Sequence, residues 1–140
     1  MQHKFRVLLV EDDDSLRVCL HEFLTNHGWA VAATARGAEA IRMAEQQAFD
    51  FSILDFHLPD GTNGLQVFQA IRQIRPLPTI LMSGAANGEE TEQAHQAGIF
   101  TFLRKPLELE LLRQSVQLLI QHHFGNRRPP QSPPGFPPIS

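Results

Sequence analysis

The 140-residue sequence predicts an α/β fold, a (βα)5 doubly wound sheet in which five parallel strands alternate with five helices. Five short apolar runs are spaced along residues 1–124, and each is followed by a stretch with helical periodicity. The runs are nearly continuous rather than alternating, which is typical of parallel strands that helices cover on both faces. We expect the common strand order 2-1-3-4-5, with right-handed crossovers.

The strands are expected where the apolar runs have the length of an ordinary strand. In chain order they are residues 5–10, 29–33, 51–54, 79–82 and 99–103.

The helices follow from apolar side chains that repeat every three or four residues. The first carries this repeat from Leu16 to Leu24, with Gly28 at a C-cap position, and the third is stopped by Pro76. Cys19 lies in the first repeat, so we expect it in the core. The fourth helix has the fewest apolar residues, and we expect it to be the most easily displaced. The five repeats cover residues 16–24, 38–44, 67–74, 89–97 and 112–120.

Composition divides the chain near residue 124. Six of the ten prolines lie between Pro129 and Pro138, and no charged residue follows Arg128. We therefore expect one folded domain at residues 1–124 and a disordered, proline-rich tail or linker at residues 125–140. Docking of this tail to a proline-reading domain is the less favoured interpretation.

Charge and composition also exclude several classes of function. The net charge of −3 gives no basic face for nucleic acid, and no apolar stretch approaches the ~20 residues of a membrane span. A single cysteine and an N-terminus without a signal peptide favour the cytoplasm. We expect a cytoplasmic domain that binds neither nucleic acid nor membrane.

The polar residues that follow the expected strands form the candidate site. The carboxyl ends of parallel strands meet at one edge of a sheet, and ligands bind where the strand order reverses. Three carboxylates, one hydroxyl and one ammonium group are therefore expected to converge. These belong to Glu11, Asp12, Asp55, Ser83 and Lys105.

This set of groups suits phosphoryl chemistry with a divalent cation. Three close carboxylates raise one another's pKa unless a cation joins them, and oxygen ligands with room for water suit Mg²⁺. Cation and lysine would neutralise phosphoryl oxygens, while an attacking carboxylate would become an acyl phosphate. The Lys105–Pro106 bond is a candidate cis peptide that would aim the lysine into the site. Asp13 and Asp14 are expected to begin the helix rather than bind the cation.

Four segments resemble the receiver domain of two-component response regulators. They are LLVEDD, ILDFHLPDG, ILMSG and FLRKP, in this order across residues 5–122. The resemblance implies a flavodoxin-like fold. One departure is the loop DGTN between Pro59 and Gly64, which is one residue longer than is usual in this family.

The resemblance also implies a role for each site residue. Asp55 is the expected phosphoacceptor. Asp12 is expected to bind Mg²⁺ directly and Glu11 mainly through water, and the backbone carbonyl of His57 would complete the protein ligands.

The remaining residues implied by the resemblance would respond to the phosphoryl group. Ser83 would donate a hydrogen bond to it and Lys105 would pair with it. Phe102 is at the position of the aromatic switch, whose rotamer is expected to follow Ser83 inward.

The expected function is signalling rather than metabolic catalysis. A sensor histidine kinase or a histidine phosphotransfer protein would donate the phosphoryl group, and the domain would catalyse only its own phosphorylation and autodephosphorylation. Phosphorylation would alter the surface of the fourth helix, fifth strand and fifth helix for a downstream protein. A phosphorylation-dependent homodimer is left open.

Two alternatives compete with this interpretation. Asp12-Asp13-Asp14 offers the D-x-D pattern of an aspartate-dependent phosphatase of the haloacid dehalogenase type, although no acidic residue follows Glu110. A binding module that never carries phosphate is the other alternative. Such a module would normally have lost one of the acidic residues, Asp55 or Lys105, and all are present.

Overall fold

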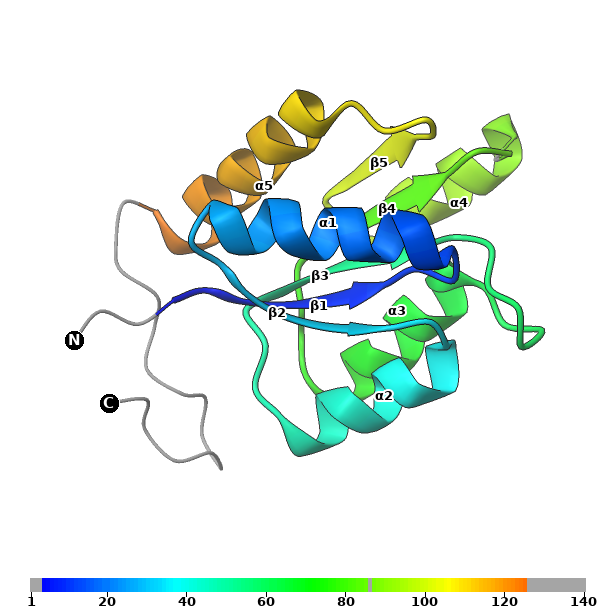
Figure 1. Cartoon of the computed structure of the whole chain (residues 1–140). Helices are drawn as coiled ribbons and strands as arrows, with labels where there is room; N and C mark the ends of the chain where they lie inside the picture. The colour runs from blue at the N-terminus through cyan, green and yellow to red at the C-terminus, as the bar shows by residue number, and fades with distance from the viewer. Residues whose placement is uncertain (1–3, 86, 126–140) are drawn as a thin grey trace.

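The fold was taken from a computed structural model, which describes residues 4–85 and 87–125. It contains five strands and five helices in strict alternation (Figure 1). The strands are β1 (Arg6–Val10), β2 (Ala30–Thr34), β3 (Phe51–Asp55), β4 (Thr79–Ser83) and β5 (Thr101–Arg104). The helices are α1 (Asp14–Asn26), α2 (Gly37–Gln46), α3 (Gly64–Ile74), α4 (Gly88–Ala97) and α5 (Leu109–Phe124).

All strand pairs are parallel, and the order in the sheet is β2-β1-β3-β4-β5. This order confirms the predicted fold class. The strand order reverses between β1 and β3, because β1 pairs with β2 on one side and β3 on the other. The residues that follow β1 and β3 are therefore neighbours at the carboxyl edge of the sheet.

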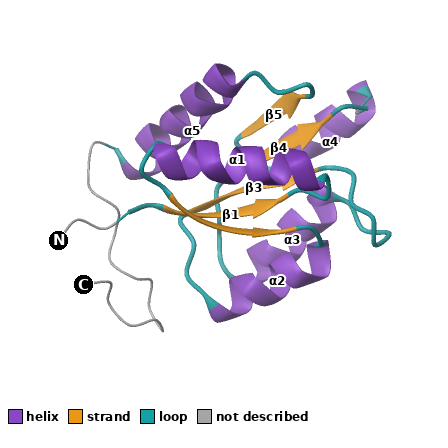
Figure 2. Cartoon of the chain, in the orientation of Figure 1, coloured by secondary structure: helices purple, strands orange, loops and turns teal. Residues whose placement is uncertain are grey.

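The helices form two layers that cover opposite faces of the sheet (Figure 2). Alternate residues of β1 point to opposite faces, as the pleat of a strand requires. Val7 and Leu9 pack with side chains of α1 and α5, whereas Leu8 and Val10 pack with side chains of α2, α3 and α4. The result is a three-layer sandwich with a hydrophobic core on each side of the sheet.

The helix ends follow ordinary capping chemistry. Asn63 and Asn87 each begin a helix with a capping box, in which the asparagine side chain and the N3 side chain satisfy free amides reciprocally. Gly28 lies just after the end of α1 with φ +93, a left-handed conformation that favours glycine. The predicted glycine at the end of the first helix is thus confirmed.

The prediction for Cys19 was wrong, because its side chain is exposed. The stripe of α1 that faces the sheet runs through Leu20 and Leu24, and Cys19 points away from it. The prediction for the fifth strand began two residues early. Ile99 is buried but donates its amide to the end of α4, so it packs as part of the helix end.

Helix α4 is the least anchored of the five, with Ala94 as its one buried residue. This agrees with the low apolar content of its sequence. Its displacement on signalling stays a prediction. The proline-rich segment lies outside the described residues, except for Gly125, and its predicted disorder also stays a prediction.

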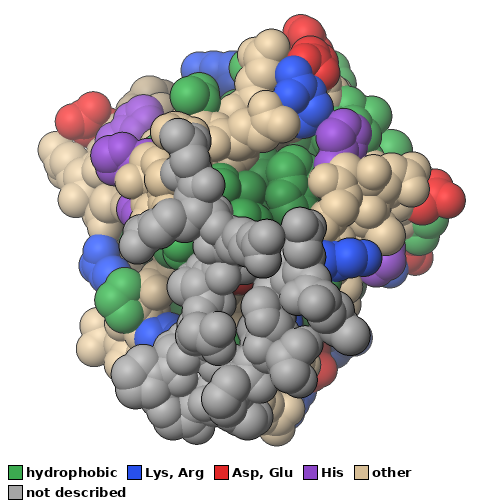
Figure 3. All heavy atoms as spheres, turned by 90° about the vertical axis from the view of Figure 1, so that its left-hand side faces the viewer, with side chains coloured by type: hydrophobic (Ala, Val, Ile, Leu, Met, Phe, Trp, Pro, Cys, Tyr) green, Lys and Arg blue, Asp and Glu red, His purple; other side chains and the backbone are tan. Residues whose placement is uncertain are grey.

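The sheet edge at which the strands begin faces the viewer in Figure 3, and hydrophobic side chains reach the surface in its middle. A cavity of about 210 Å³ at this edge is lined mainly by aromatic and proline side chains, Phe68, Pro76, Pro78 and Phe100 among them. Within the described residues, no helix is long and apolar enough to cross a membrane.

Candidate functional site

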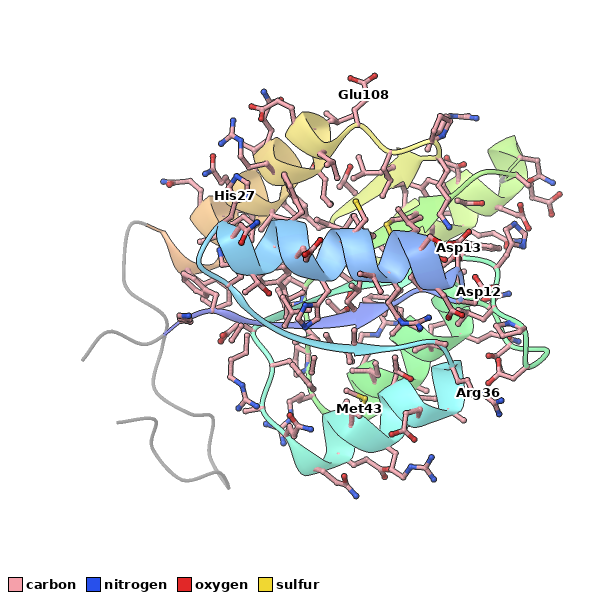
Figure 4. The ribbon with its side chains drawn as sticks, viewed as in Figure 1. Asp12, Asp13, His27, Arg36, Met43 and Glu108 are labelled. Carbon is pink, nitrogen blue, oxygen red and sulfur yellow. The ribbon has the colours of Figure 1, made fainter. Side chains whose placement is uncertain are left out.

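The candidate site lies at the opposite edge, where the strands end. Val10 pairs with Leu54 in the sheet, so Glu11 and Asp55, the next residues of the two chains, come side by side. The end of β4 contributes Ser83, and Lys105 follows β5 directly. In Figure 4, Asp12 lies at this edge beside the start of α1, while His27 marks the other end of that helix.

Three carboxylates meet there as predicted. One oxygen from each of Glu11, Asp12 and Asp55 lies within 4.8 Å of the others. Glu11 is 0% exposed and Asp55 is 3% exposed, whereas Asp12 is open to solvent. Two carboxylates are thus held out of water, where an ionised group is costly unless a cation joins it.

Lys105 supplies part of the compensating charge. Its Nζ lies 3.0 Å from Oδ2 of Asp55 and 2.7 Å from Oε1 of Glu11. The Lys105–Pro106 peptide bond is cis, as the sequence suggested. The backbone amide of Lys105 donates to the carbonyl of Ser83 at 2.9 Å, which ties the lysine to the end of β4.

The electrostatics of the two buried groups reflect this crowding. Burial and the neighbouring Glu11 carboxylate together raise the pKa of Asp55 to about 7, although Lys105 acts in the opposite direction. Burial by itself would lower the pKa of Lys105, but its contacts with Glu11 and Asp55 outweigh that effect and raise it. One ammonium group therefore does not balance two buried carboxylates in the absence of a metal.

The oxygens of Glu11 show where a further cation fits. Oε2 accepts the backbone amide of Asp13 at 3.0 Å, whereas Oε1 is buried and has no hydrogen bond beyond its ion pair with Lys105. A buried acceptor with spare capacity, two more carboxylates close by and one open side at Asp12 suit an oxygen-ligated divalent cation that keeps some of its waters. The residues present fit such an ion.

Asp13 and Asp14 belong to the start of α1, as predicted. The Asp13 side chain caps the helix by accepting the Leu16 amide at 2.9 Å, and Asp14 forms an ion pair with Arg17 at 2.7 Å. Arg17 also donates to the backbone carbonyl of Glu11 at 3.0 Å. This second contact could not be predicted from the residue pattern, because it depends on the turn between β1 and α1.

The other predicted residues surround the carboxylates. The backbone amide of His57 donates to Oδ1 of Asp55 at 3.2 Å, and Ser83 is buried with its hydroxyl accepting the Ala85 amide at 3.2 Å. Phe102 is half-buried, and its ring centroid lies 6.2 Å from that of Phe56, the residue after Asp55. No described contact joins Ser83 or Phe102 to Asp55 directly.

Gly64 contributes to the site through its lack of a side chain. A Cβ at this position would collide with the backbone carbonyl of Asp55, and the Gly64 amide donates to Phe56 O at 2.7 Å. The first turn of α3 therefore lies directly against the end of β3. In the sequence, Gly64 is simply the residue that follows the DGTN loop. The reason for a glycine at this position is visible only in three dimensions.

Comparison with known proteins identifies this arrangement. The family described as response regulator receiver domain matches residues 7–117. The chain belongs to this family. It is 33% identical over 118 residues to the transcriptional regulatory protein GlrR of Escherichia coli (strain K12), an alignment that covers 83% of this chain and 26% of that protein. Such curated relatives are two to four times longer than the part that the chain matches.

Solved receiver domains share the fold. The signal receiver domain of a putative LuxO repressor protein from Vibrio parahaemolyticus superimposes with a TM-score of 0.80 at 29% identity, over 86% of this chain and 92% of that one. A CheY-like receiver domain from Methanospirillum hungatei JF-1 gives 0.79 at 25% identity, over 85% and 96%. Membership of this family contradicts the phosphatase alternative, in which the nucleophile would follow the first strand.

Proposed function

We propose that this receiver domain accepts a phosphoryl group on Asp55 in a Mg²⁺-dependent reaction. The donor would be a phosphohistidine of a sensor histidine kinase or of a histidine phosphotransfer protein. The observation that carries the proposal is the placement of Asp55. Its carboxylate is 3% exposed, lies 3.0 Å from Lys105 Nζ and shares a cluster with Glu11 and Asp12.

The proposed reaction is a direct transfer. A carboxylate oxygen of Asp55 attacks phosphorus, the phosphorus–nitrogen bond breaks, and the electron pair leaves with the donor imidazole. Lys105 and the amide of His57 already hold the Asp55 carboxylate at 3.0 and 3.2 Å, which fixes its orientation for attack. Lys105 would then pair with a phosphoryl oxygen, and the Ser83 hydroxyl would donate to another.

Glu11, Asp12 and the backbone carbonyl of His57 are the proposed partners of Mg²⁺ together with Asp55. When bound, the ion supplies positive charge to the phosphoryl oxygens. The role of the chain is to gather the acidic ligands at the edge of the sheet. Water later hydrolyses the acyl phosphate, so the domain catalyses only its own phosphorylation and dephosphorylation.

The proposed output is a shift of the surface formed by α4, β5 and α5. Ser83 lies at the end of β4, just before the segment that leads to α4, and α4 has only Ala94 buried among the described residues. A modest pull on Ser83 could therefore move α4, with Phe102 repacking behind it. A downstream protein, or a second copy of the domain, would recognise the altered surface.

We further propose that the domain works in the cytoplasm and that its partners are proteins rather than membrane or nucleic acid. Relatives such as GlrR are named transcriptional regulators and are much longer than this chain. A transcriptional output for the whole protein is a proposal on that basis. The domains would be residues 1–124 as the receiver and residues 125–140 as a linker or tail.

The test is incubation with acetyl phosphate and Mg²⁺, followed by measurement of intact mass. Wild-type protein should gain one phosphoryl group, and Asp55→Asn and samples with EDTA should gain none. A domain that gains no phosphoryl group under any condition would be a binding module instead. A phosphoryl group that persists in Asp55→Asn would defeat the assignment of Asp55.

A further inference from the structure

The loop between β3 and α3, residues 56–63, makes contacts with α2 that the proposed reaction does not explain. The Asp60 carboxylate accepts the Ala38 amide through Oδ2 at 3.5 Å and the Thr62 hydroxyl through Oδ1 at 2.8 Å. Helix α2 has no side-chain cap of its own, because Arg36 at its N-cap makes none. Asp60 therefore caps this helix from a residue 22 positions away in the sequence.

The packing beneath Asp60 is close. A Cβ on Gly37, the first residue of α2, would lie 2.7 Å from a methyl group of Val67 in α3, 2.8 Å from Thr62 Oγ1 and 3.3 Å from a methyl group of Leu58. Only a glycine lets the loop approach α2 so closely. We call the contacts of Leu58, Asp60 and Thr62 with Gly37 and Ala38 the loop clasp.

The position of the loop clasp relates it to the candidate cation site. Helix α2 follows β2 and the loop follows β3, and β1 lies between these two strands. The loop clasp therefore joins the segments on either side of the end of β1, where Glu11 and Asp12 lie. The Glu11 amide donates to the carbonyl of Thr34 at the end of β2, so Glu11 is itself bonded to one of the two segments that the loop clasp joins.

The same loop begins inside the site. His57 donates its amide to Asp55, and its backbone pairs with Asn63 to close the base of the loop. A loop held at its base and at its tip is already ordered when a cation arrives. A loop free at its tip would lose conformational entropy when the cation binds. That loss would make the binding free energy less favourable and so weaken the affinity for the cation.

We propose that Asp60 is a positioning residue for the cation site, and that the DGTN segment reaches α2 to form the loop clasp. This inference rests on the proposed function. Asp60 acts through the loop and does not touch the cation.

The test is calorimetric titration of Mg²⁺ into the whole chain, with hydrogen exchange of the metal-free protein. Asp60→Ala should weaken Mg²⁺ binding by about fivefold, less than the ~10-fold or greater loss that follows removal of a group bonded directly to a metal ligand, because Asp60 acts through the loop. It should also speed exchange of the Ala38 amide. Asp60→Asn keeps an oxygen acceptor and should stay within about twofold of wild type. The thermal midpoint should change by less than about 3 °C.

Glu39→Gln is the matched control for charge, because Glu39 also lies in the first turn of α2 but pairs with Arg42 instead of the loop. It should leave binding within about twofold. The inference is overturned if Asp60→Ala binds Mg²⁺ as wild type does, or if Glu39→Gln weakens binding equally. Wild-type protein that binds no Mg²⁺ would overturn the proposed function as well, so the two failures are distinguishable.

Discussion

Asp55→Asn should stabilise the metal-free domain, which makes this substitution a direct test of the electrostatics of the site. The pKa of the Asp55 carboxyl is about 7 in the folded protein, against the ordinary value of 3.8 for an aspartate. The folded state therefore holds a proton that the unfolded state releases, and wild-type stability falls as the pH rises from about 4 to about 7. Asparagine does not titrate and keeps one oxygen acceptor, which can serve either Lys105 or the His57 amide but not both.

The magnitude follows from the size of the shift. At 1.36 kcal/mol per pKa unit, the ionised Asp55 costs at most about 4 kcal/mol above pH 7, and more than half of this cost develops between pH 5 and pH 8. Loss of the attraction to Lys105 in the variant offsets part of this gain. We expect the advantage of Asp55→Asn in unfolding free energy to widen by about 1–2 kcal/mol from pH 5 to pH 8.

The assay is urea unfolding in EDTA at the two pH values, followed by circular dichroism and by the fluorescence of the buried Trp29. Asp14→Asn is the control, because Asp14 is exposed and its pair with Arg17 is a surface ion pair. Adding Mg²⁺ should stabilise wild type and have little effect on Asp55→Asn. An Asp55→Asn variant no more stable than wild type at pH 8, or a difference that does not change with pH, would refute this account of the site.

Three further substitutions test individual contacts. Lys105→Ala should lower the free energy of unfolding in EDTA by about 1–3 kcal/mol, because it leaves two buried carboxylates without the lysine ammonium group. In a denaturant titration, Mg²⁺ should recover part of this loss. Gly64→Ala should cost about 2 kcal/mol or more and should also slow phosphorylation from acetyl phosphate, because its Cβ would displace the Asp55 backbone. Asn87→Ala should cost about 1 kcal/mol and raise hydrogen exchange in the first turn of α4, where the capping box is lost. Unchanged exchange there would show that α4 does not depend on its cap.

The fold and the gathering of the site could be predicted because both depend on local patterns and one general rule. Apolar runs and helical repeats identify the elements, and parallel strands bring the residues after them to one edge. These two rules are sufficient to place Glu11 beside Asp55, and to place Lys105 near both carboxylates. The burial of each group could not be predicted, since Asp12 and Glu11 are adjacent in sequence and yet one is exposed and the other is not.

The errors and omissions concern contacts that a one-dimensional pattern does not contain. Cys19 satisfies the spacing of an apolar stripe, but the buried stripe of α1 is narrow and passes through Leu20 and Leu24. Ile99 is as apolar as a strand residue, yet it completes the end of α4. The contact of Asp60 with Ala38 joins the loop before α3 to the first turn of α2, 22 residues away in the sequence, and no local pattern indicates it.

The metal-free site also explains why a cation and a phosphoryl group would be linked. With three carboxylates gathered at this edge and one lysine paired to two of them, the cluster carries a net charge of −2 when all groups are ionised. That state is unfavourable for two buried acids, so Asp55 holds its proton near pH 7 and is a poorer nucleophile. A divalent cation would cancel the excess charge and release the proton from Asp55. The close packing of buried acids lowers the stability of the fold when no cation is bound. It would also make the reactivity of Asp55 depend on the same cation that the transferred phosphoryl group needs.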